Sequence, residues 1–474
     1  MGEGTGNTGA PIVAVANRLP IIRERGAWRL APGGLVTALL PAMRDRDGAW
    51  IGWDGGSEQV PARVSAIDVD LHPVELSRAQ LQGYYYGFSN RTLWPLFHDL
   101  VEAAVYDRNW WQSYDQANRA FARAADRVAA GRPPVFWVHD YHLLLLPHLL
   151  RDGHPESPIG FFLHIPFPPA ELFTRLPMRD ELLRGMLGAD HVSFHAPRYQ
   201  RNFIDAATHC LDDVKQDGDD LVLADGRRVT TAAHPISIDV DSFTGLATDP
   251  KVARELASLR KRFARRRVLL GVDRMDYTKG ILERLRAIEL LLERRSDLRT
   301  SVAFVQVAVP SRDDVKEYRD LREHVEAEIG RINGRFTESG GDVPVYYMYR
   351  SVRRARLVAY YLLADVALVT PKKDGMNLVA KEFVVTQSAG GGSGALVLSE
   401  FAGAARELTD AVLCNPFDVE GLSVAIEQAL GLSESERRRA LDTMAAHVRD
   451  HDVTRWVDDE LAGIDAAAAR RAAP

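Results

Sequence analysis

Short apolar runs alternate with longer amphipathic stretches along most of the chain. Runs this short, rich in Val, Ile and Phe, are typical of strands buried on both faces of a parallel sheet. The amphipathic stretches between them are typical of helices, so the pattern predicts repeated strand–helix units. In the first half of the chain the predicted strands are residues 12–16, 50–53, 135–138, 160–163 and 191–194.

A short connector at residues 235–245 separates this series from a second one. The helix predicted over residues 314–333 has Glu and Arg on its solvated face. Ser433 and Glu436 have the spacing of a capping box at the start of a late helix, and residues 452–469 predict a terminal helix. Two series in succession indicate two α/β domains. The strands predicted in the second series are residues 267–272, 302–309, 344–349, 365–370, 395–399 and 411–414.

Two regions of the first half are less regular. After residue 18 the sequence predicts a polar loop, and Gly33 and Gly34 then precede a helix over residues 35–43. Paired glycines let backbone N–H groups approach an anion or a sugar closely. Residues 75–130 combine helical periodicity with many aromatic side chains. Most of these rings are expected in a core, but aromatic faces also contact sugars, so one or two are candidates for a binding site.

Polar residues stand directly after several of the predicted strands. Arg18 follows the first strand, Asp140 follows the strand that ends at residue 138, and His164 and His195 follow the next two. The carboxyl ends of parallel strands meet at one edge of a sheet, which is where open α/β sheets bind ligands. We therefore expect a ligand site at this edge.

The most informative stretch is VALVTPKKDGMNLVAKE, residues 366–382. An apolar run is followed by a turn at Asp374 and Gly375, and then by a helix that starts at Leu378 and includes Glu382. A helix N-terminus at the end of a strand favours an anion, because its N–H groups are unpaired and its dipole is positive there. The spacing alone favours an ordinary strand–turn–helix unit with a charged loop.

Fixed cations stand between a strand and a helix in a second stretch, VDRMDYTKG. Arg274 and Lys279, with Gly280 allowing close approach, can neutralise a diphosphate leaving group. Three consecutive arginines at residues 265–267 are interpreted instead as part of a solvated face. No Asp-x-Asp follows a predicted strand and no His, Cys or Asp spacing matches a metal site, so we expect neither a metal nor a cofactor.

Composition limits the class of protein. The chain has 474 residues, 46% hydrophobic and 26% charged, which is typical of a protein with two or three folded domains. A net charge of −6 argues against nucleic acid or an anionic membrane as a partner. Cys210 and Cys414 match no metal spacing and fit a reducing cytosol. Residues 1–10 predict a disordered tail without a signal pattern, and no apolar run is long enough to span a membrane, so the expected location is cytoplasmic.

Several motifs recur in the order found in one known family. DGMNLVAKE at residues 374–382 resembles the donor-binding signature of the trehalose-6-phosphate synthases, which are retaining glycosyltransferases. The resemblance covers residues 12–455 and rests on many segments. The others are NRLP at 17–20, PGGLVTALLP at 32–41, WIGWDG at 50–55, YYYGFSNRTLWPLFH at 84–98, WVHDYHLLLLP at 137–147, IGFFLHIPFP at 159–168, GVDRMDYTKGI at 271–281, PSRDDV at 310–315 and EFAGAARELTDAVLCNPFD at 400–418.

This resemblance implies the GT-B fold, in which two Rossmann-like, doubly wound α/β domains face each other across a cleft. Residues 11–238 would then form an acceptor-binding domain and residues 239–455 a nucleotide-sugar-binding domain. Residues 456–474 would form a C-terminal helix that returns to the first domain. The oligomeric state stays open, with a homo-oligomer among the alternatives.

The resemblance also implies roles on the donor side. Arg274 and Lys279 would bind the phosphates of a nucleotide sugar, Glu382 its ribose hydroxyls, and Val352 its base through the main chain. Asp374 and His164 would contact the glucose hydroxyls. The remaining implied donor-binding positions are Gly33, Gly34, Asn377, Leu378 and Val379.

On the acceptor side the resemblance implies a phosphorylated sugar. Arg18 and Arg312 would bind its phosphate together, and Tyr85 would add a hydroxyl to the same phosphate. Asp140 would bind acceptor hydroxyls. The expected aromatic neighbours of this site are Trp94 and, of the two tryptophans in WIGWDG, Trp50.

The implied activity is transfer of glucose from a nucleotide-glucose donor to glucose 6-phosphate, giving α,α-trehalose 6-phosphate with retention and without a catalytic metal. In this front-face reaction the leaving phosphate takes the proton of the attacking hydroxyl, and the enzyme supplies charge and position. Two carboxylates flanking the scissile bond would instead indicate double displacement. The implied catalytic residues are Asp140, His164, Arg274, Lys279 and Asp374.

Three alternatives stay open from the sequence. UDP-glucose is the default donor, but GDP-glucose and ADP-glucose are alternatives that residues 349–354 would decide. The acceptor differs in glucosylglycerol-phosphate synthases and in relatives that couple pseudo-sugars. A non-catalytic regulatory homologue is a further alternative, although none of the residues named above is lost.

Overall fold

The computed structural model describes residues 10–24, 27–31, 34–44, 46–55, 60–61, 64, 67–129, 133–312, 315–338 and 341–472. Gly33 and nearly all of the tail expected over residues 1–10 lie outside these ranges. The chain divides into two compact units. The first comprises Met1–Ile236 and Thr454–Pro474, and the second comprises Ser237–Val453.

The second unit contains a six-stranded sheet whose neighbouring strands all run parallel. The strand order is β14-β13-β12-β15-β16-β17, so the chain builds outward from β12 and then crosses back to β15 to build outward on the other side. This is the order of a doubly wound Rossmann-like sheet, with its switch point between β12 and β15. The strands are β12 (Arg267–Arg274), β13 (Val302–Val309), β14 (Val345–Tyr349), β15 (Val366–Val369), β16 (Ala395–Ser399) and β17 (Val412–Cys414).

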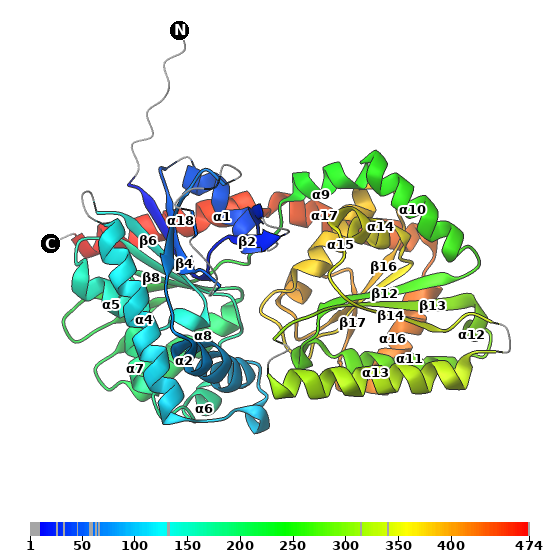
Figure 1. Ribbon diagram of the computed structural model, residues 1–474, viewed down its shortest axis with the longest axis horizontal. Coiled ribbons are helices and arrows are strands. Elements are labelled where there is room, and N and C mark those ends of the chain that lie inside the picture. Colours follow the sequence, from blue (N-terminus) through cyan, green and yellow to red (C-terminus); the bar gives the residue numbers. More distant parts are fainter. Residues whose placement is uncertain are drawn as a thin grey trace, which may run out of the picture. The chain divides into compact units, whose positions relative to one another are not determined.

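Helices cover both faces of this sheet, as Figure 1 shows. On one side lie α11 (Ile281–Arg294) and α13 (Lys316–Phe336), and on the other α14 (Arg354–Leu363) and α15 (Leu378–Ala389). The core forms because apolar residues recur at helical spacing on α11 and meet the apolar side chains of the strands. The remaining helices of this unit are α9 (Val240–Ala247), α10 (Pro250–Arg262), α12 (Leu298–Ser301), α16 (Val419–Gly431) and α17 (Glu434–Asp450).

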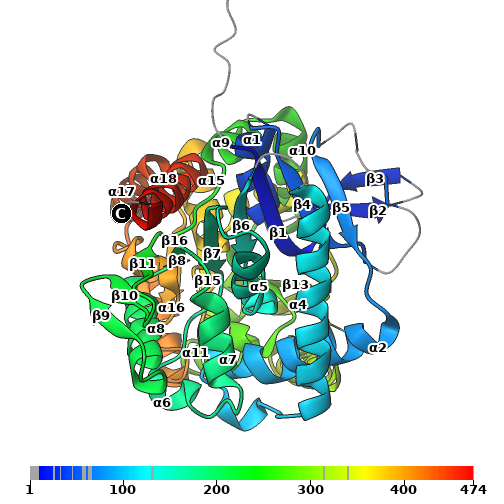
Figure 2. The ribbon, with the colours of Figure 1, turned by 90° about the vertical axis from the view of Figure 1, so that its left-hand side faces the viewer.

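The first unit contains a nine-stranded sheet of order β5-β4-β1-β6-β7-β8-β11-β10-β9. The seven strands from β5 to β11 run parallel, and β10 and β9 are antiparallel additions at one edge. Figure 2 shows β4, β1, β6, β7 and β8 side by side, with the switch point between β1 and β6. The strands are β1 (Ile12–Arg18), β4 (Ala49–Trp53), β5 (Asp70–Val74), β6 (Val135–His139), β7 (Ile159–Leu163), β8 (His191–Phe194), β9 (Lys215–Asp217), β10 (Asp220–Val222) and β11 (Arg228–Ala233).

The C-terminal helix α18 (Val453–Ala472) packs against the sheet of the first unit. The ring of Trp456 lies 5.3 Å from that of Trp137 in β6, measured between centroids. Gly160 in β7 makes room for Ile464, because a Cβ at Gly160 would overlap the isoleucine side chain. The other helices of this unit are α1 (Gly34–Arg44), α2 (Arg78–Leu81), α3 (Trp94–Phe97), α4 (Arg108–Val128), α5 (Leu146–Gly153), α6 (Ala170–Phe173), α7 (Arg179–Met186) and α8 (Pro197–Cys210).

A strand occupies every apolar run that predicts one, with ends that differ by no more than two residues. The predicted capping box is also present at the start of α17. The amide of Glu436 donates to Ser433 Oγ, and the amide of Ser433 donates to Glu436 Oε2 at 2.8 Å. Periodicity therefore located the buried elements of both units.

Two predicted loops contain regular structure instead. After residue 18 the chain forms an antiparallel hairpin of β2 (Ile21–Glu24) and β3 (Ala27–Leu30) rather than a polar loop. The connector at residues 235–245 contains the start of α9. That helix forms because the Asp239 carboxylate accepts a hydrogen bond from the amide of Ser242, which caps its first turn.

The arginines at residues 265–267 are not all solvated. Arg266 donates to the main-chain oxygens of Val302 and Val343, and Arg267 donates to that of Leu430 at 2.9 Å. Only Arg265 is exposed. Charge composition predicted a solvated face, but main-chain carbonyl groups accept from two of the three guanidinium groups.

Within the helical region at residues 75–130, the segment Gln82–Leu93 is a π-helix. It lies against α4, and a Cβ at Gly83 or Gly87 would overlap Ser113 or Trp110 of that helix. The two glycines therefore permit the close approach of backbone to α4. Apolar periodicity predicts a helix here but does not distinguish a π-helix from an α-helix.

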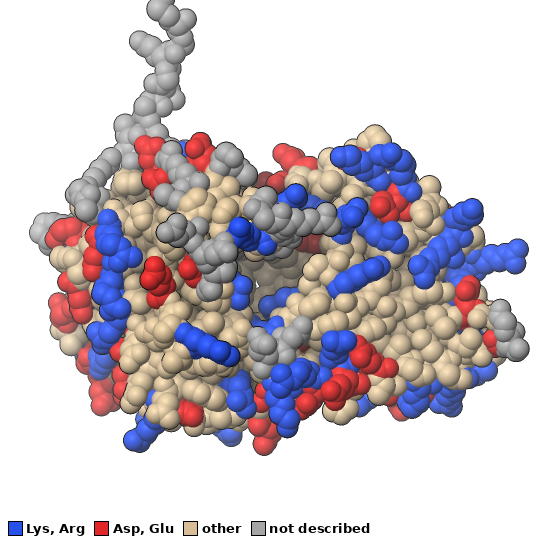
Figure 3. All heavy atoms as spheres, viewed as in Figure 1, with Lys and Arg blue, Asp and Glu red and all other residues tan. Residues whose placement is uncertain are grey.

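Acidic and basic side chains alternate on the outer face of α13, as expected for a solvated helix. Figure 3 shows blue and red groups together along the lower edge where α13 runs in Figure 1. Arg322 pairs with Glu326 at 2.8 Å and Arg331 with Glu328 at 2.8 Å. In the described part of the chain no helix is both long enough and apolar enough to cross a membrane.

Candidate active site

In the second unit, two loops meet at the switch point of the sheet. One follows β12 and contains Asp276 and Lys279, and the other follows β15 and contains Asp374. The amide of Lys372 donates to the Thr278 carbonyl at 2.7 Å, which joins the loops directly. Gly280 has a φ of +66°, and a Cβ there would overlap the Thr370 carbonyl oxygen. Glycine is therefore needed at this position both for its backbone angle and for the close approach.

The predicted cation and carboxylate of these loops contact each other. Lys279 Nζ lies 2.5 Å from Asp374 Oδ2, and the side-chain amide of Asn377 donates to the same oxygen at 3.0 Å. Asn377 is the N-cap of α15 and has a φ of +77° without a side-chain capping bond of its own. A cation, a carboxylate and a helix start, which the sequence predicts separately, thus lie together.

A buried carboxylate missed by the sequence analysis organises two of the predicted cations. Asp276 is fully buried, and its Oδ2 lies 3.9 Å from an Arg274 nitrogen and 3.5 Å from an Arg312 nitrogen. Burial by itself raises the pKa of Asp276, but Arg312, Arg274 and the nearby Lys279 outweigh it, so the pKa is lowered. The carboxylate therefore stays ionised and holds the cations in place.

Arg312 and Arg274 differ in their surroundings. The Arg312 side chain is almost entirely buried, has a φ of +53°, and donates to the hydroxyl of Tyr318, which in turn donates to Asp276 at 3.3 Å. The Arg274 side chain is 46% exposed at the end of β12. The sequence could have indicated Asp276, because this carboxylate lies between Arg274 and Lys279 in DRMDYTKG.

Arg284 is a second residue that the sequence analysis missed. It is fully buried on α11 and donates to Asp273 at 2.6 Å, to Thr370 Oγ1 at 3.0 Å and to the Lys279 carbonyl at 3.3 Å. These bonds connect β12 with both loops. The sequence could have indicated Arg284, because it is a charged residue on the apolar face of α11, one turn after Ile281.

Glu382 lies on the first turns of α15 and accepts a hydrogen bond from the Tyr361 hydroxyl at 2.7 Å. Burial raises the pKa of Glu382 to about 7, against the opposing effects of the Tyr361 hydrogen bond and Arg354. Leu378 and Val379 are the first residues of α15, so their amides belong to its N-terminal turn. Val352 is half-buried in the loop between β14 and α14.

In the first unit, Arg18 lies at the end of β1 against two aromatic rings. Its guanidinium carbon is 4.8 Å from the ring centroid of Trp53 and 5.5 Å from that of Tyr85. Trp50 is buried, and its indole nitrogen donates to the Arg18 carbonyl at 3.1 Å. Trp53, rather than the expected Trp50, is therefore the tryptophan whose ring contacts this cation.

Asp140 and His164 also lie together at the carboxyl ends of β6 and β7. Asp140 has a φ of +77°, and its carboxylate accepts from the amide of His164 at 3.3 Å. One ring nitrogen of His164 lies 3.2 Å from one of His139. Burial, and then the proximity of His195, lower the pKa of His164 well below its usual value, so its imidazole is neutral.

Two further predicted residues, Trp94 and Gly34, lie in helices rather than at the ends of strands. Trp94 is buried in α3, with its ring centroid 4.2 Å from that of His98. Gly34 starts α1, and Gly33 lies outside the described residues. Arg18 and Asp140 in the first unit, and Arg274 and Asp374 in the second, lie at or just after the carboxyl ends of the strands beside the switch point, where doubly wound sheets bind ligands.

The chain is similar to known proteins over nearly its whole length. The model of glycosyltransferase family 20 matches residues 11–465. A trehalose-6-phosphate synthase of Mycobacterium sp. (strain KMS) is 46% identical over 484 aligned residues, which cover 99% of this chain and 97% of that one. The chain belongs to glycosyltransferase family 20.

Solved structures of this family resemble the chain over nearly its whole length. The UDP-forming α,α-trehalose-phosphate synthase of Burkholderia xenovorans in complex with glucose 6-phosphate has a TM-score of 0.87 at 34% identity, covering 96% of this chain and 99% of that one. An E. coli structure with bound UDP-2-fluoro glucose has a TM-score of 0.87 at 34% identity, covering 96% and 98%. The resemblance to trehalose-6-phosphate synthases and the α/β fold with two parallel-sheet domains are thus confirmed.

Replacing Glu382 with Gln should remove a pH-dependent cost of folding. A carboxyl whose pKa is raised by folding is destabilising once ionised, so the stability of the parent should fall as pH rises from 5 to 8. The Gln variant keeps an acceptor for Tyr361. Its Tm should match that of the parent near pH 4 and exceed it by about 4–8 °C at pH 8. The exposed Glu420→Gln is the control, and a Tm difference that does not change with pH would contradict the assignment.

Replacing Arg284 with Met should destabilise the second unit strongly. The variant leaves the Asp273 carboxylate buried without its guanidinium, which costs about 3–5 kcal/mol. Thermal or urea unfolding should show this loss. Arg438→Met removes an exposed pair with Glu434 and should change stability by less than about 0.5 kcal/mol. Equal effects in the two variants would be inconsistent with a buried network that holds the loops.

Proposed function

We propose that this chain transfers glucose from UDP-glucose to glucose 6-phosphate, releasing UDP and forming α,α-trehalose 6-phosphate with retention. One observation carries the proposal: a cation, a carboxylate and a helix start contact one another at the switch point of the second sheet, in a member of family 20. The ligands of the similar structures, glucose 6-phosphate and a UDP-sugar, support the choice of both substrates.

On the donor side, we assign the diphosphate to Arg274, Lys279 and the first amides of α15 at Leu378 and Val379. The 2.5 Å contact with Asp374 fixes the Lys279 ammonium beside the N-cap of α15, so two sources of positive potential converge there. Such fixed charges stabilise the negative charge that grows on a leaving diphosphate.

Other donor contacts follow the same assignment. Glu382 would accept from the ribose hydroxyls, Val352 would contact the base through its main chain, and Asp374 and His164 would contact the glucose hydroxyls. Gly34 at the start of α1, with Gly33 before it in the sequence, would allow backbone amides to approach the donor. A neutral His164 can donate or accept one hydrogen bond to a hydroxyl.

On the acceptor side, we assign the phosphate of glucose 6-phosphate to Arg18 and Arg312, with a hydroxyl from Tyr85. The stacking of Arg18 on aromatic rings and the contact of Arg312 with Asp276 both limit the motion of these guanidinium groups. Asp140 would accept from acceptor hydroxyls. Trp94 and the tryptophans of β4 would shape the pocket.

The reaction then needs little from protein acid–base groups. As the bond between glucose C1 and the β-phosphate oxygen breaks, the acceptor C1 hydroxyl attacks the same face of the sugar. Its proton passes to the departing β-phosphate oxygen, so the products are the α,α-linked disaccharide phosphate and UDP. Arg274 and Lys279 neutralise the leaving group, while Asp140, Asp374 and His164 hold the two sugars in register.

The proposal also covers the location of the enzyme and its choice of substrates. We assign the enzyme to the cytoplasm, a location that the two free thiols of Cys210 and Cys414 support. Incubation with UDP-, GDP- or ADP-glucose and either glucose 6-phosphate or glycerol 3-phosphate tests the substrates. Trehalose 6-phosphate formed fastest from UDP-glucose is the expected product. A glucosylglycerol phosphate, or no product from any pair, would favour the acceptor variants or a regulatory homologue.

Lys279→Ala should lower kcat by about 10- to 150-fold, because a charge-assisted contact to the leaving group is lost in the transition state. The KM for glucose 6-phosphate should change little. Lys372→Ala is a matched control in the neighbouring loop, since Lys372 pairs with Glu283 at 2.7 Å. A near-normal kcat for the Lys279 variant with every donor would refute the assignment.

Arg312→Met should raise the KM for glucose 6-phosphate by about 10- to 100-fold, since the guanidinium is removed while much of the side-chain length is kept. The Kd for the donor should change little, because Arg274 and Lys279 remain. Arg322→Met on the exposed face of α13 is the control. A donor Kd weakened as much as the acceptor KM would place Arg312 with the nucleotide instead.

A further inference from the structure

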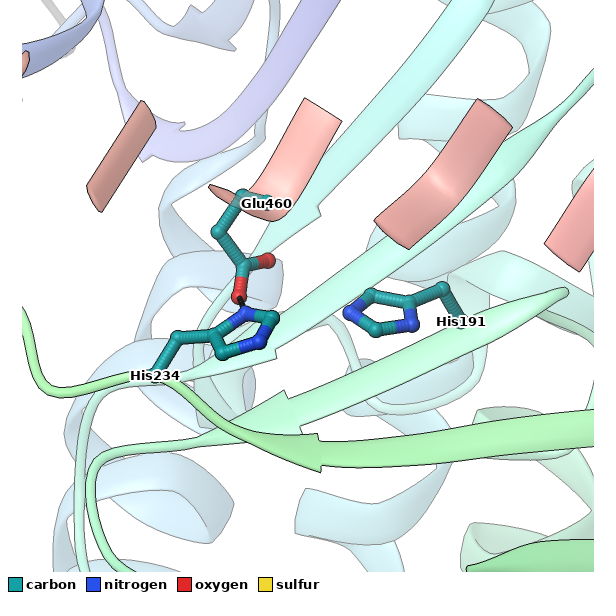
Figure 4. Close-up of side chains that lie close together, drawn as sticks. All are labelled: His191, His234 and Glu460. Carbon is teal, nitrogen blue, oxygen red and sulfur yellow. Dashed lines mark hydrogen bonds and ion pairs between the residues drawn. The ribbon is translucent and has the colours of Figure 1, made fainter. Parts of the chain in front are cut away.

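Three side chains from distant parts of the first unit converge beneath α18. His191 is the first residue of β8, His234 directly follows β11, and Glu460 lies on α18. Strands β8 and β11 are parallel neighbours, with Thr230 opposite His191. Figure 4 shows both imidazole rings and the carboxylate pointing toward one another. Their ligand atoms, one from each residue, all lie within 4.8 Å of one another.

Two members of this cluster are already joined. His234 Nδ1 lies 2.6 Å from Glu460 Oε1, and Glu460 Oε2 accepts from Ser193 Oγ at 2.7 Å. Glu460 is fully buried, while the His234 side chain is 25% exposed. One carboxylate oxygen of Glu460 therefore contacts His234 and the other contacts Ser193, and the negative charge lies inside the protein.

His191 is the member without a partner. It is 1% exposed, and in the described part of the chain neither of its ring nitrogens has a hydrogen-bond partner. Its ring lies 5.7 Å from that of His234 between centroids, at an angle of 27°. Gly463 of α18 passes over the ring so closely that a Cβ there would overlap it. A buried polar group without a partner is costly, so its position calls for a ligand or a role.

We propose that His191, His234 and Glu460 bind one zinc ion that fastens α18 to the sheet of the first unit. Two imidazoles and one carboxylate form a donor set that zinc prefers, whereas magnesium and calcium prefer all-oxygen sets. The ion gives His191 a partner and compensates the buried charge of Glu460. The ion takes the place of the hydrogen between His234 Nδ1 and Glu460, and His234 binds it as a neutral imidazole whose hydrogen lies on Nε2.

The geometry requires only a small adjustment. Ligand atoms lie about 2.0–2.2 Å from zinc, so those of one tetrahedral ion are about 3.5 Å apart. From the present spacing, His234 Nδ1 and Glu460 Oε1, which lie 2.6 Å apart, must separate to admit the ion, and the His191 ring must move inward. A water molecule or Ser193 Oγ completes the fourth position. Since the ligands come from β8, the segment after β11 and α18, the site is a structural one and uses none of the residues assigned to substrates.

Zinc titration of the full-length protein, after removal of metal with a chelator, tests this proposal. Calorimetry, or competition with a chromophoric chelator, should show one ion per chain with a Kd below about 1 μM. His191→Gln and His234→Gln should each weaken binding by at least about 100-fold. His148→Gln is the control, since His148 is an exposed histidine of the same unit and should leave the Kd unchanged.

Thermal unfolding gives a second measurement that does not involve activity. Free Zn²⁺ at 100 times the Kd should raise the Tm of the parent by about 5–10 °C, and millimolar Mg²⁺ should not. The rise should vanish in His191→Gln. If that variant does not fold, Glu460→Gln, which retains hydrogen-bonding groups for Ser193 and His234, serves in its place. No binding by the parent, or binding equally tight in the His191 and Glu460 variants, would overturn the proposal.

Discussion

The close contact between two loops at the switch point of the second sheet governs the geometry of the candidate active site. Gly280 brings the loop after β12 against the Thr370 carbonyl, at a distance that no side chain at this position would allow. The amide of Lys372 and the carbonyl of Thr278 then join the loops. Only with this approach does the Lys279 ammonium reach Asp374 at the start of α15. A wider turn would leave the same residues present but separated.

Charge pairing maintains this arrangement. The cations of the site are held by carboxylates that are themselves buried or half-buried: Lys279 by Asp374, Arg312 by Asp276, and the supporting Arg284 by Asp273. Each pair fixes a cation before any substrate binds, so little reorganisation remains when charge develops on a leaving group. Breaking one partner of such a pair costs more than the pair itself contributes, which makes the loops sensitive to single substitutions.

The first unit is completed by the last helix of the chain. α18 contributes Trp456 to the packing against β6 and Glu460 to hydrogen bonds with Ser193 and His234. A zinc ion at this cluster would join three segments that are remote in sequence and leave the substrate residues untouched. The proposed ion thus accounts for His191, whose buried ring nitrogens have no hydrogen-bond partner among the described residues. This ion would be structural, whereas the reaction proposed for the active site uses no metal.

Much of the fold and part of the site follow from the sequence alone, because they depend on local patterns. Apolar runs such as residues 302–309 become buried strands wherever helices cover both faces of a sheet, and DGMNLVAKE marks a strand–turn–helix unit by its own residues. Tertiary structure decided what lies opposite what. No local pattern connects the segments that meet in these contacts. They are the pairing of Lys279 with Asp374, the burial of Arg284, the position of Trp53 rather than Trp50 beside Arg18, and the cluster of His191, His234 and Glu460. Those contacts depend on strand order and on close backbone approach, which arise only when the whole sheet has formed.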